Sequence, residues 1–344
     1  MQGERRRRGL ALLAGLTAVV IGASGAAVAL GAKGDLHLVS RQSDADGGAG
    51  ANSRSFGPSL SDRGRLVAFT SEATNLGSIE GNATVYVYNF ANRTVEIVSR
   101  QSANAGGLPA DGFSVAAEIS GNGRFVVFRT DATNLGGPIA ADENIYVYDR
   151  REDRVQLVSR RSKAAGGAGA NEDADSPSIS ANGRYVSYQT QATNLGGPID
   201  GEGEANVYVY DRREKRTFLV SRRSHGGKGG NGNSFETSLA PSAPVVVFQS
   251  QATNLGGPTH PDASANVYAY DWKRRKLELA ARRSGNGKGP NSAADLPDVS
   301  ASGRLVLFET DATNLGGPLR GPEGTRRLYI HDRKTGRTSL VSRR

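Results

Sequence analysis

Short runs in which aliphatic and aromatic residues alternate recur along the chain, and they predict strands that are buried on both faces. The runs read V-Y-V-Y, I-Y-V-Y, V-Y-V-Y, V-Y-A-Y and L-Y-I-H, and they begin at Val85, Ile145, Val207, Val267 and Leu328. Successive side chains of a strand point to opposite faces of a sheet, so a sheet with one wet face alternates apolar with polar residues. Here both positions are apolar, which predicts that each small sheet packs between two others.

A second recurring stretch, A-T-N-L-G, sets the period of the pattern. Its asparagines are separated by 59, 60, 60 and 60 residues: Asn75, Asn134, Asn194, Asn254 and Asn314. A period this regular indicates an array of similar units. We place the repeats at approximately 43–100, 101–160, 161–222, 223–282 and 283–343.

The third repeat shows the parts of one unit most clearly. It predicts short strands at 176–180, 184–190, 206–211 and 217–222, with a tight turn between the first two. β-Branched and aromatic residues fill these segments, while Gly, Asn, Asp and Pro separate them. Each repeat is therefore expected to form a four-stranded antiparallel meander. Sheets of this kind that pack on both faces are typical of the radially stacked blades of a β-propeller.

The stretch SPSISANGRYVSYQT (176–190), followed by NVYVYDRREKRTFLVSR (206–222), resembles the TolB-type, WD-like β-propeller repeat. The resemblance covers about residues 35–344 and is specific for the fold. It does not select a function, because such propellers serve as partner-binding domains, as non-catalytic parts of peptidases and as unassigned secreted proteins. TolB itself carries an α/β domain ahead of its propeller. We expect no counterpart of that domain here, which argues against a role in the Tol–Pal envelope system.

The number of blades follows from counting the repeats. Five copies of the four-strand order occupy about 56–343, and one more fourth-strand phrase, LHLVSR, precedes them at 36–41. We favour five blades with this leading strand added where the ring closes. An incomplete six-bladed ring is the alternative.

Residues 1–32 form a hydrophobic N-terminal segment that indicates export. Four arginines, Arg5–Arg8, precede an uncharged apolar stretch at 9–32, and Ala27-Val28-Ala29 offers a cleavage signature. A cleaved signal peptide and a retained membrane anchor both fit, because about 20 apolar residues suffice to span a bilayer. Either interpretation places the propeller outside the cytoplasm, in the periplasm, at the cell surface or in the medium.

The net charge favours anionic partners without selecting one. The chain carries +9, and residues 33–344 carry 39 basic and 33 acidic residues, a net charge of +6. Nucleic acid is disfavoured because the leader directs the chain away from the cytoplasm and the basic residues are not interleaved with aromatic ones. With no cysteine, thiolate catalysis and cysteine metal sites are excluded. The four histidines share no ligand spacing, so we predict no metal, no cofactor and no catalytic set.

Arginines recur at the ends of the fourth strands and are the candidate ligand-binding residues. They are Arg100, Arg160, Arg222 and Arg282, with Arg41 and Arg343 at the ends of the array. One interpretation is a peripheral band that attracts an anionic polymer or lipid head groups. The other is that the fourth strand is an exposed edge whose charges discourage edge-to-edge pairing.

The repeated asparagines are interpreted as structural rather than as a ring of ligand contacts. Asn75 and its four equivalents are expected to bond the backbone of their own loop, while the following leucine fills the gap between blades. The long connections, second to third strand and fourth to first, are expected on one face of the propeller. Loops held by a rigid scaffold are where function concentrates, so binding is predicted on that face.

Two functional hypotheses follow. The favoured one is an exported, monomeric, non-catalytic β-propeller that binds a protein or an anionic cell-envelope partner through its long-loop face. The alternative is a glycan or ester hydrolase whose carboxylates come from different blades and meet near the propeller axis, an arrangement that sequence spacing does not show.

Overall fold

The computed structural model describes residues 28–30, 36–78, 82–200, 203–257, 259, 264–285, 287–322 and 324–342. These residues form five four-stranded antiparallel sheets and one two-stranded sheet, and short 3₁₀ turns are their only helical elements. The predicted all-β, five-bladed β-propeller is thereby confirmed. None of the described residues forms a helix long and apolar enough to cross a bilayer. The predicted leader lies outside the described residues, apart from Val28–Leu30.

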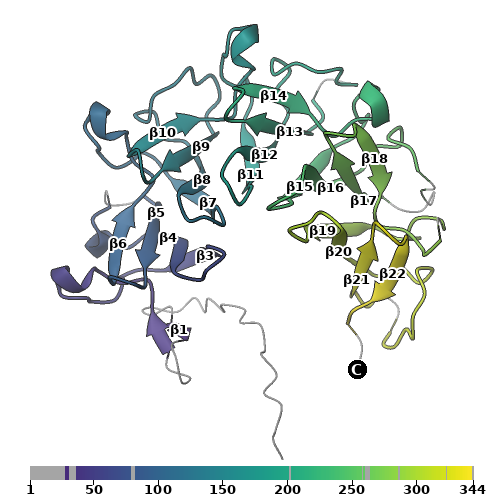
Figure 1. Cartoon of the computed structure of the whole chain (residues 1–344), viewed down its shortest axis with the longest axis horizontal. Helices are drawn as coiled ribbons and strands as arrows, with labels where there is room; N and C mark the ends of the chain where they lie inside the picture. The colour runs from purple at the N-terminus through teal and green to yellow at the C-terminus, as the bar shows by residue number, and fades with distance from the viewer. Residues whose placement is uncertain are drawn as a thin grey trace, which may run out of the picture.

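Every blade runs outward from the centre in the order of its strands, as Figure 1 shows. The innermost strands are β3 (Ser55–Leu60), β7 (Ser114–Ile119), β11 (Ala174–Ile179), β15 (Ser234–Leu239) and β19 (Ala294–Val299). The second strands are β4 (Leu66–Ser71), β8 (Phe125–Thr130), β12 (Tyr185–Thr190), β16 (Val245–Ser250) and β20 (Leu305–Thr310). The third strands are β5 (Thr84–Asn89), β9 (Asn144–Asp149), β13 (Asn206–Asp211), β17 (Asn266–Asp271) and β21 (Arg327–Asp332). The outermost strands are β6 (Thr94–Ile97), β10 (Arg154–Leu157), β14 (Arg216–Leu219), β18 (Lys276–Leu279) and β22 (Arg337–Leu340).

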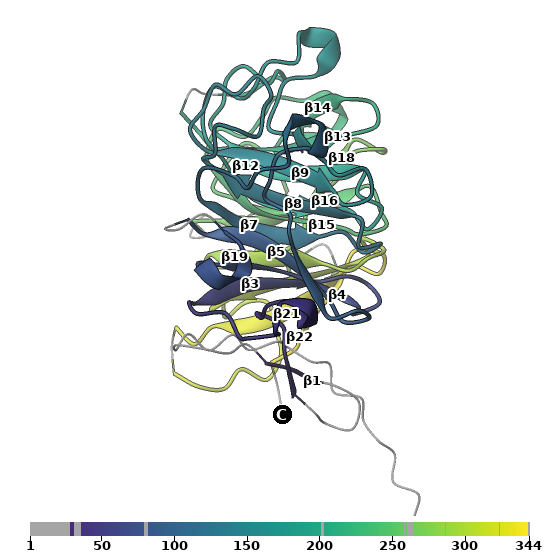
Figure 2. The same ribbon diagram turned by 90° about the vertical axis from the view of Figure 1, so that its left-hand side faces the viewer.

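The blades, numbered 1 to 5 along the chain, follow one another round an arc, and seen from the side they form a single flat layer (Figure 2). Each inner strand packs against the next, from β3 through β7, β11 and β15 to β19. No comparable packing joins the described strands of blade 5 to those of blade 1. The five described blades therefore form an arc that is open between blade 1 and blade 5.

The leading strand does not complete the ring. β2 (Leu36–Leu38) pairs with β1 (Val28–Leu30) in a separate two-stranded sheet and joins neither blade 1 nor blade 5. The prediction that this strand is added at the seam is therefore wrong. Blade 5 is completed by its own outer strand, β22, and needs no strand from the N-terminal part of the chain.

The predicted packing of the third strands is confirmed by their burial. In blades 2, 3 and 4 every residue of the third strand is buried, whichever face of the sheet it points to. On one face, a ring of the second strand stacks on a tyrosine of the third in every blade, with centroids 5.5–6.3 Å apart. The pairs are Phe69–Tyr86, Phe128–Tyr146, Tyr188–Tyr208, Phe248–Tyr268 and Phe308–Tyr329.

The inner strands share a β-bulge that the sequence pattern does not predict. Pairing with the second strand shifts register between the second and fifth residue of each inner strand. The third residue of each strand adopts a positive φ, between 48° and 60°. Blade 1 has glycine at this position, whereas the other blades hold larger residues there: Gly57, Ala116, Ser176, Glu236 and Leu296.

The connections between blades run along the outer rim. They correct the predictions that the fourth strands are exposed edges and that the long connections stay on one face. After β10, the chain runs along β14 of the next blade: the Ser162 hydroxyl accepts from the Thr217 N–H at 2.9 Å and donates to its carbonyl at 3.1 Å. The Lys163 N–H then bonds the Lys215 carbonyl at the far hairpin. A serine bonds the next outer strand in the same way in each blade: Ser43, Ser102, Ser162, Ser224 and Ser284. The outer strands are thus not exposed edges, and these connections do not stay on one face.

Candidate functional site

The A-T-N-L-G loops make the structural contacts of the kind predicted, a hydrogen-bonded asparagine and a buried leucine, but the asparagine has other partners than expected. The asparagine bonds the connection that enters its blade rather than its own loop: Asn194 Nδ2 donates to the Gly169 carbonyl at 2.7 Å, and its Oδ1 accepts from the Asn171 N–H at 3.2 Å. Equivalent bonds are made by Asn75, Asn134, Asn254 and Asn314. The leucine beside it is buried in every blade, as expected for a plug: Leu76, Leu135, Leu195, Leu255 and Leu315.

The candidate arginines lie at successive junctions between blades, and their contacts differ from one junction to the next. Arg100 is tied to blade 2: its Nε donates to the Tyr148 hydroxyl at 2.8 Å and its Nη2 pairs with the Asp153 carboxylate. Arg222 donates from Nε and Nη2 to the Gly227 carbonyl at 3.1 and 3.0 Å. The carbonyl of Arg282 accepts a bond from the Thr338 hydroxyl. Arg343 lies outside the described residues.

Arg160 resembles Arg222 in donating to a carbonyl of its own connection, that of Gly167, but it differs from the other three because it lines a cleft. The cleft has a volume of about 580 Å³ and opens at the rim between blades 2 and 3. Its walls come from β10, from the outer hairpins of both blades and from the connection that carries Arg160. Five of its residues are basic and two are acidic, a net charge of +3: Arg154, Arg160, Lys163, Arg212 and Lys215 against Asp149 and Glu152. Gln156, Gly166 and Tyr210 complete the lining.

The two carboxylates of the rim cleft are engaged elsewhere. Arg124, which does not line the cleft, binds Asp149 through two bonds, Nε to Oδ1 at 2.7 Å and Nη2 to Oδ2 at 2.6 Å. The same Nη2 lies 3.3 Å from Oε1 of Glu152. The attraction of Arg124 and two backbone N–H bonds lower the pKa of Asp149 although burial alone raises it. Neither carboxylate forms an ion pair with a basic side chain that lines the cleft.

Arg212 is the most constrained cation of the rim cleft. It is half-buried, its Nη1 donates to the Gly183 carbonyl at 2.7 Å, and its Nε lies 3.3 Å from Oε1 of Gln156. The guanidinium carbon lies 4.2 Å from the centre of the Phe125 ring. Burial lowers the pKa of Arg212 to about 10, which the attraction of Asp149 and Tyr210 only partly offsets. The side chain therefore keeps its charge at neutral pH while lacking a carboxylate partner among the described residues.

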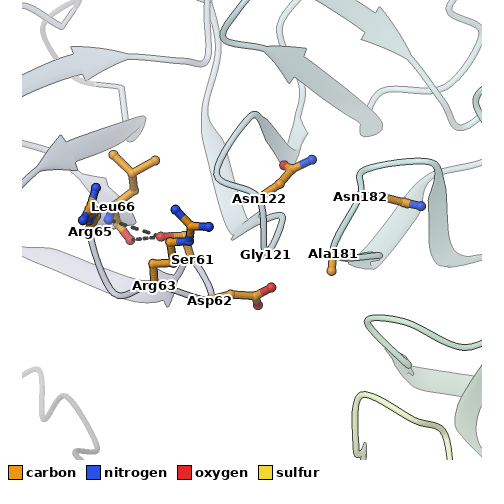
Figure 3. A pocket seen from close by; sticks show the side chains of 9 residues that line it. All are labelled: Ser61, Asp62, Arg63, Arg65, Leu66, Gly121, Asn122, Ala181 and Asn182. Atoms are coloured by element: carbon orange, nitrogen blue, oxygen red, sulfur yellow. Dashed lines mark hydrogen bonds between the residues drawn. The ribbon is translucent and has the colours of Figure 1, made fainter.

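A second cleft lies among the hairpins that join the first and second strands of blades 1 to 3. Its volume is about 650 Å³, and Figure 3 shows its lining: Ser61, Asp62, Arg63, Arg65, Leu66, Gly121, Asn122, Ala181 and Asn182. The charged side chains all come from one hairpin of blade 1 and are exposed. This cleft gathers no set of groups from several blades that indicates a particular chemistry.

The inner strands bring polar side chains together near the axis, as the hydrolase alternative requires. The fifth residue of one inner strand bonds the backbone or side chain of the next blade: Ser59 accepts from the Ile119 N–H at 3.1 Å, and Ser238 donates to Asp298 at 2.9 Å. Glu118 occupies this position in blade 2. Burial, helped by the negative charge of Asp298, raises the pKa of Glu118 to about 7, although hydrogen bonds from Ile179 and Ser178 oppose the shift.

The histidines lie in separate places. Among the described residues no group of three or more histidine and carboxylate side chains is arranged to hold a metal ion. His331 is fully buried in its strand, and its Nδ1 lies 2.8 Å from the Thr338 hydroxyl. Burial lowers the pKa of His331 to about 4. His260 lies outside the described residues.

Sequence reasoning found Arg160 but missed Arg212, Gln156 and Lys215. The signal was present in the aligned repeats. The hairpin after β9 reads D-R-R-E-D-R and the one after β13 reads D-R-R-E-K-R, so a single aspartate is exchanged for Lys215. The exchange becomes informative only once the structure shows that the hairpin with Lys215 lies beside Arg160 of the preceding blade.

Comparisons with known proteins give a family and distant structural similarities. The chain is similar to a putative TolB from Agrobacterium tumefaciens (13% identity, 83% of this chain and 79% of that one, TM-score 0.47). It is also similar to TolB from Acinetobacter baumannii (14%, 85% and 56%, TM-score 0.46) and to an oligogalacturonate lyase in complex with manganese (11%, 83% and 76%, TM-score 0.43). No curated protein sequence matches the chain. The family of unknown function DUF7453 matches residues 10–222, which include blades 1 to 3 and the rim cleft, and the chain therefore belongs to that family.

Proposed function

We propose that the chain is an exported, non-catalytic binding protein that recognises an anionic envelope partner through the rim cleft between blades 2 and 3. The observation that carries this proposal is the unbalanced charge of the cleft. Five basic side chains line it, and its two carboxylates are already bound by Arg124. A concave surface of one charge concentrates counter-ions and speeds the encounter with a charged partner.

The rim cleft is a better binding surface than the face expected from loop length. On that face the asparagines of the A-T-N-L-G loops bond the connection that enters the blade, as Asn194 Oδ1 does when it accepts from the Asn171 N–H at 3.2 Å. Side chains that are used in this way offer few free donors to a partner. Lys163, Lys215 and Arg154, by contrast, are exposed at the mouth of the rim cleft.

The test compares binding of the full chain to polyphosphate, as a soluble model of a phosphate-bearing polymer, before and after charge reversal. Arg154→Glu combined with Lys215→Glu changes two exposed residues of the rim cleft. Arg151→Glu combined with Arg213→Glu makes the same change in net charge at exposed residues that do not line it. We expect the first pair to weaken binding by about tenfold or more and the second pair to have a much smaller effect. Equal effects of the two pairs would show that only net charge matters.

The hydrolase remains a second candidate because of one observation. A carboxyl with a pKa near 7 is suited to act as a general acid, and Glu118 lies close enough to Asp298 to be affected by its charge. Turnover of a panel of aryl esters and aryl glycosides by the full chain, abolished by Glu118→Gln, would establish this candidate. If no ester and no glycoside is turned over, the hydrolase candidate is rejected and the binding function is retained.

Export is part of the proposal and is supported by the sequence of residues 1–32. Intact mass of the protein recovered from its native cells distinguishes the two forms. Loss of about the first 29 residues would indicate a cleaved signal peptide. Membrane association of the intact chain would indicate an anchor, and an intact chain in the cytosol would contradict export.

A further inference from the structure

At two of the four junctions between successive blades, arginine–carboxylate pairs join the blades at the rim. At the junction of blades 1 and 2, Arg150 bonds the carboxylate of Glu96, and Arg100 bonds that of Asp153. At the junction of blades 4 and 5, Arg333 bonds the carboxylate of Glu278 in the same way as Arg150. In each case a cation from one blade is neutralised by an anion from its neighbour.

The junction of blades 2 and 3 keeps both arginines but has neither carboxylate. Gln156 is the third residue of β10, where Glu96 is the third residue of β6, so Arg212 faces an amide in place of a carboxylate. Lys215 directly precedes β14, as Asp153 directly precedes β10, so a second cation lines the cleft with Arg160 where Arg100 has an anion. Arg275 holds the same position before β18. Relative to its neighbour, this junction therefore lacks two negative charges and gains one positive charge.

The next junction shows how the fold otherwise accommodates such a loss. Between blades 3 and 4, Trp272 replaces the arginine that faces the outer strand of the preceding blade, and its ring packs 5.0 Å from Tyr185 and 6.1 Å from Phe218. An apolar contact there substitutes for the ion pair. Between blades 2 and 3 the arginine is retained, half-buried and held in place by the Gly183 carbonyl.

A partly buried cation without an ion-pair partner is costly, because burial removes water and, for Arg212, the attraction of Asp149 offsets that loss only in part. At this site the cost is increased by the other cations that share the cleft. An anion bound between the blades removes both penalties. A guanidinium group matches the oxygens of carboxylates and phosphates in a fork of two parallel hydrogen bonds, so Arg160 and Arg212 are suited to that role.

We infer that Arg160, Arg212 and Lys215 form a site for a phosphate group, which takes the place of the two carboxylates that close the preceding junction. This inference rests on the proposed anion-binding function and names the group that is bound. A phosphate monoester carries close to two negative charges at neutral pH, matching the two that are missing, and its oxygens can accept from several donors. The Tyr210 hydroxyl and the Gln156 amide, which lie 3.5 Å apart, supply further donors in the same cleft.

The size of the rim cleft indicates that the phosphate is one group of a larger ligand. Its volume of about 580 Å³ falls in the range of sites that enclose whole small molecules. Exposed Lys163 and Arg154 stand at its mouth and can contact a second charged group of the same ligand. Because blades 2 and 3 both contribute donors, binding is expected to stabilise their junction.

The experiment titrates the full chain with inorganic phosphate at constant ionic strength, with chloride as the matched anion. It measures both the heat of binding and the melting temperature. Wild type should bind phosphate saturably and melt at a higher temperature in its presence. Arg212→Gln removes the central donor and should weaken binding by about tenfold or more. Arg213→Gln, the matched control, removes an equal charge at the adjacent exposed position and should bind as wild type does.

A second variant keeps the test decisive if Arg212→Gln does not fold. Gln156→Glu combined with Lys215→Asp restores the charge pattern of the preceding junction. We expect this variant to melt at a higher temperature than wild type without phosphate and to lose the response to phosphate. Unchanged phosphate binding in this variant would refute the site while leaving an anion-binding function elsewhere on the chain.

The source of the phosphate group is distinguished by the probes. Competition of inorganic phosphate with polyphosphate supports a phosphate-bearing polymer, and selective binding to phosphatidylglycerol vesicles over phosphatidylcholine vesicles instead assigns the group to a lipid. A sulfate response equal to that of phosphate would overturn the assignment to phosphate but not the site. If phosphate, sulfate, polyphosphate and anionic vesicles all fail to bind, the proposed function fails together with this inference.

Discussion

The backbone N–H of Ile179 in blade 3 donates a hydrogen bond to Oε1 of Glu118 in blade 2, at a distance of 3.3 Å. In two other blades a serine hydroxyl fills the same role: Ser59 accepts from Ile119, and Ser178 accepts from Leu239. The inner strand is the edge of its sheet, so an N–H that points away from the second strand needs an acceptor from elsewhere, and the neighbouring blade supplies it. Glu118 therefore joins two blades through a group that can also ionise.

Ionisation of Glu118 should make the stability of the protein depend on pH. Its pKa is about 7 in the folded chain and about 4.5 when unfolded, so between these values the folded state binds more protons and stability falls as pH rises. Glu118→Gln keeps an acceptor for Ile179 but cannot ionise. We expect the variant to gain about 1–3 kcal/mol relative to wild type between pH 5 and pH 8.

Urea denaturation of both proteins at pH 5 and pH 8 measures this gain. Taking the difference between the two proteins cancels the opposite contribution of His331, whose lowered pKa makes stability fall as pH drops below about 6.5. A difference that stays the same at both pH values would mean that Glu118 is ionised, or solvated, equally in the folded and unfolded chains.

Ala116 holds a left-handed backbone conformation, with φ of 52°, at the bulge where blade 1 uses Gly57. A side chain in this conformation costs energy that glycine avoids. We expect Ala116→Gly to raise the free energy of unfolding by about 0.5–1 kcal/mol. Ala117→Gly, at the adjacent buried position with ordinary backbone angles, should lower it by a similar amount. Thermal unfolding of the pair checks the opposite signs, and destabilisation by both would refute the bulge as a source of strain.

Leu195 and Asn194 contribute to the same loop by different means. Leu195→Ala removes a buried side chain from between the blades and should cost about 2–4 kcal/mol. Asn194→Ala removes two hydrogen bonds to the entering connection and should cost about 1–2 kcal/mol. Chemical denaturation gives both values. A larger loss for the asparagine would assign the loop's stability to its polar contacts.

Arg100 and Arg160 are equivalent in sequence but should respond differently to the same change. Arg100→Ala breaks the bonds to Tyr148 and Asp153 and should lower stability by about 1–2 kcal/mol. Arg160→Ala removes the bond to the Gly167 carbonyl together with one of five cations of the rim cleft, and the relief of repulsion should offset the lost bond and leave stability within about 0.5 kcal/mol of wild type. Melting temperatures without added phosphate compare them, and equal losses would show that Lys215 does not affect Arg160.

The sequence predicted the parts of the fold that follow from local patterns. The period of the asparagines and the alternating third strands were enough for the repeat, the strand order and the burial of both sheet faces. The separate pairing of β2 with β1, the opening between blades 5 and 1 and the rim contacts were not, because they depend on how blades meet. The same division applies to the candidate site. Arg160 could be predicted because it recurs in every repeat, whereas the role of Arg212 depends on Gln156, which faces it from another blade.

The central claim is that Arg160 and Arg212 bind an anionic group between blades 2 and 3. A crystal structure of the wild-type protein with a phosphate monoester, glycerol phosphate, at saturating concentration and matched ionic strength tests it most directly. The account predicts tetrahedral density within hydrogen-bonding distance of both guanidinium groups, which is lost in Gln156→Glu crystals treated in the same way. Density bound only elsewhere, with Arg212 still facing Gln156 alone, would contradict it.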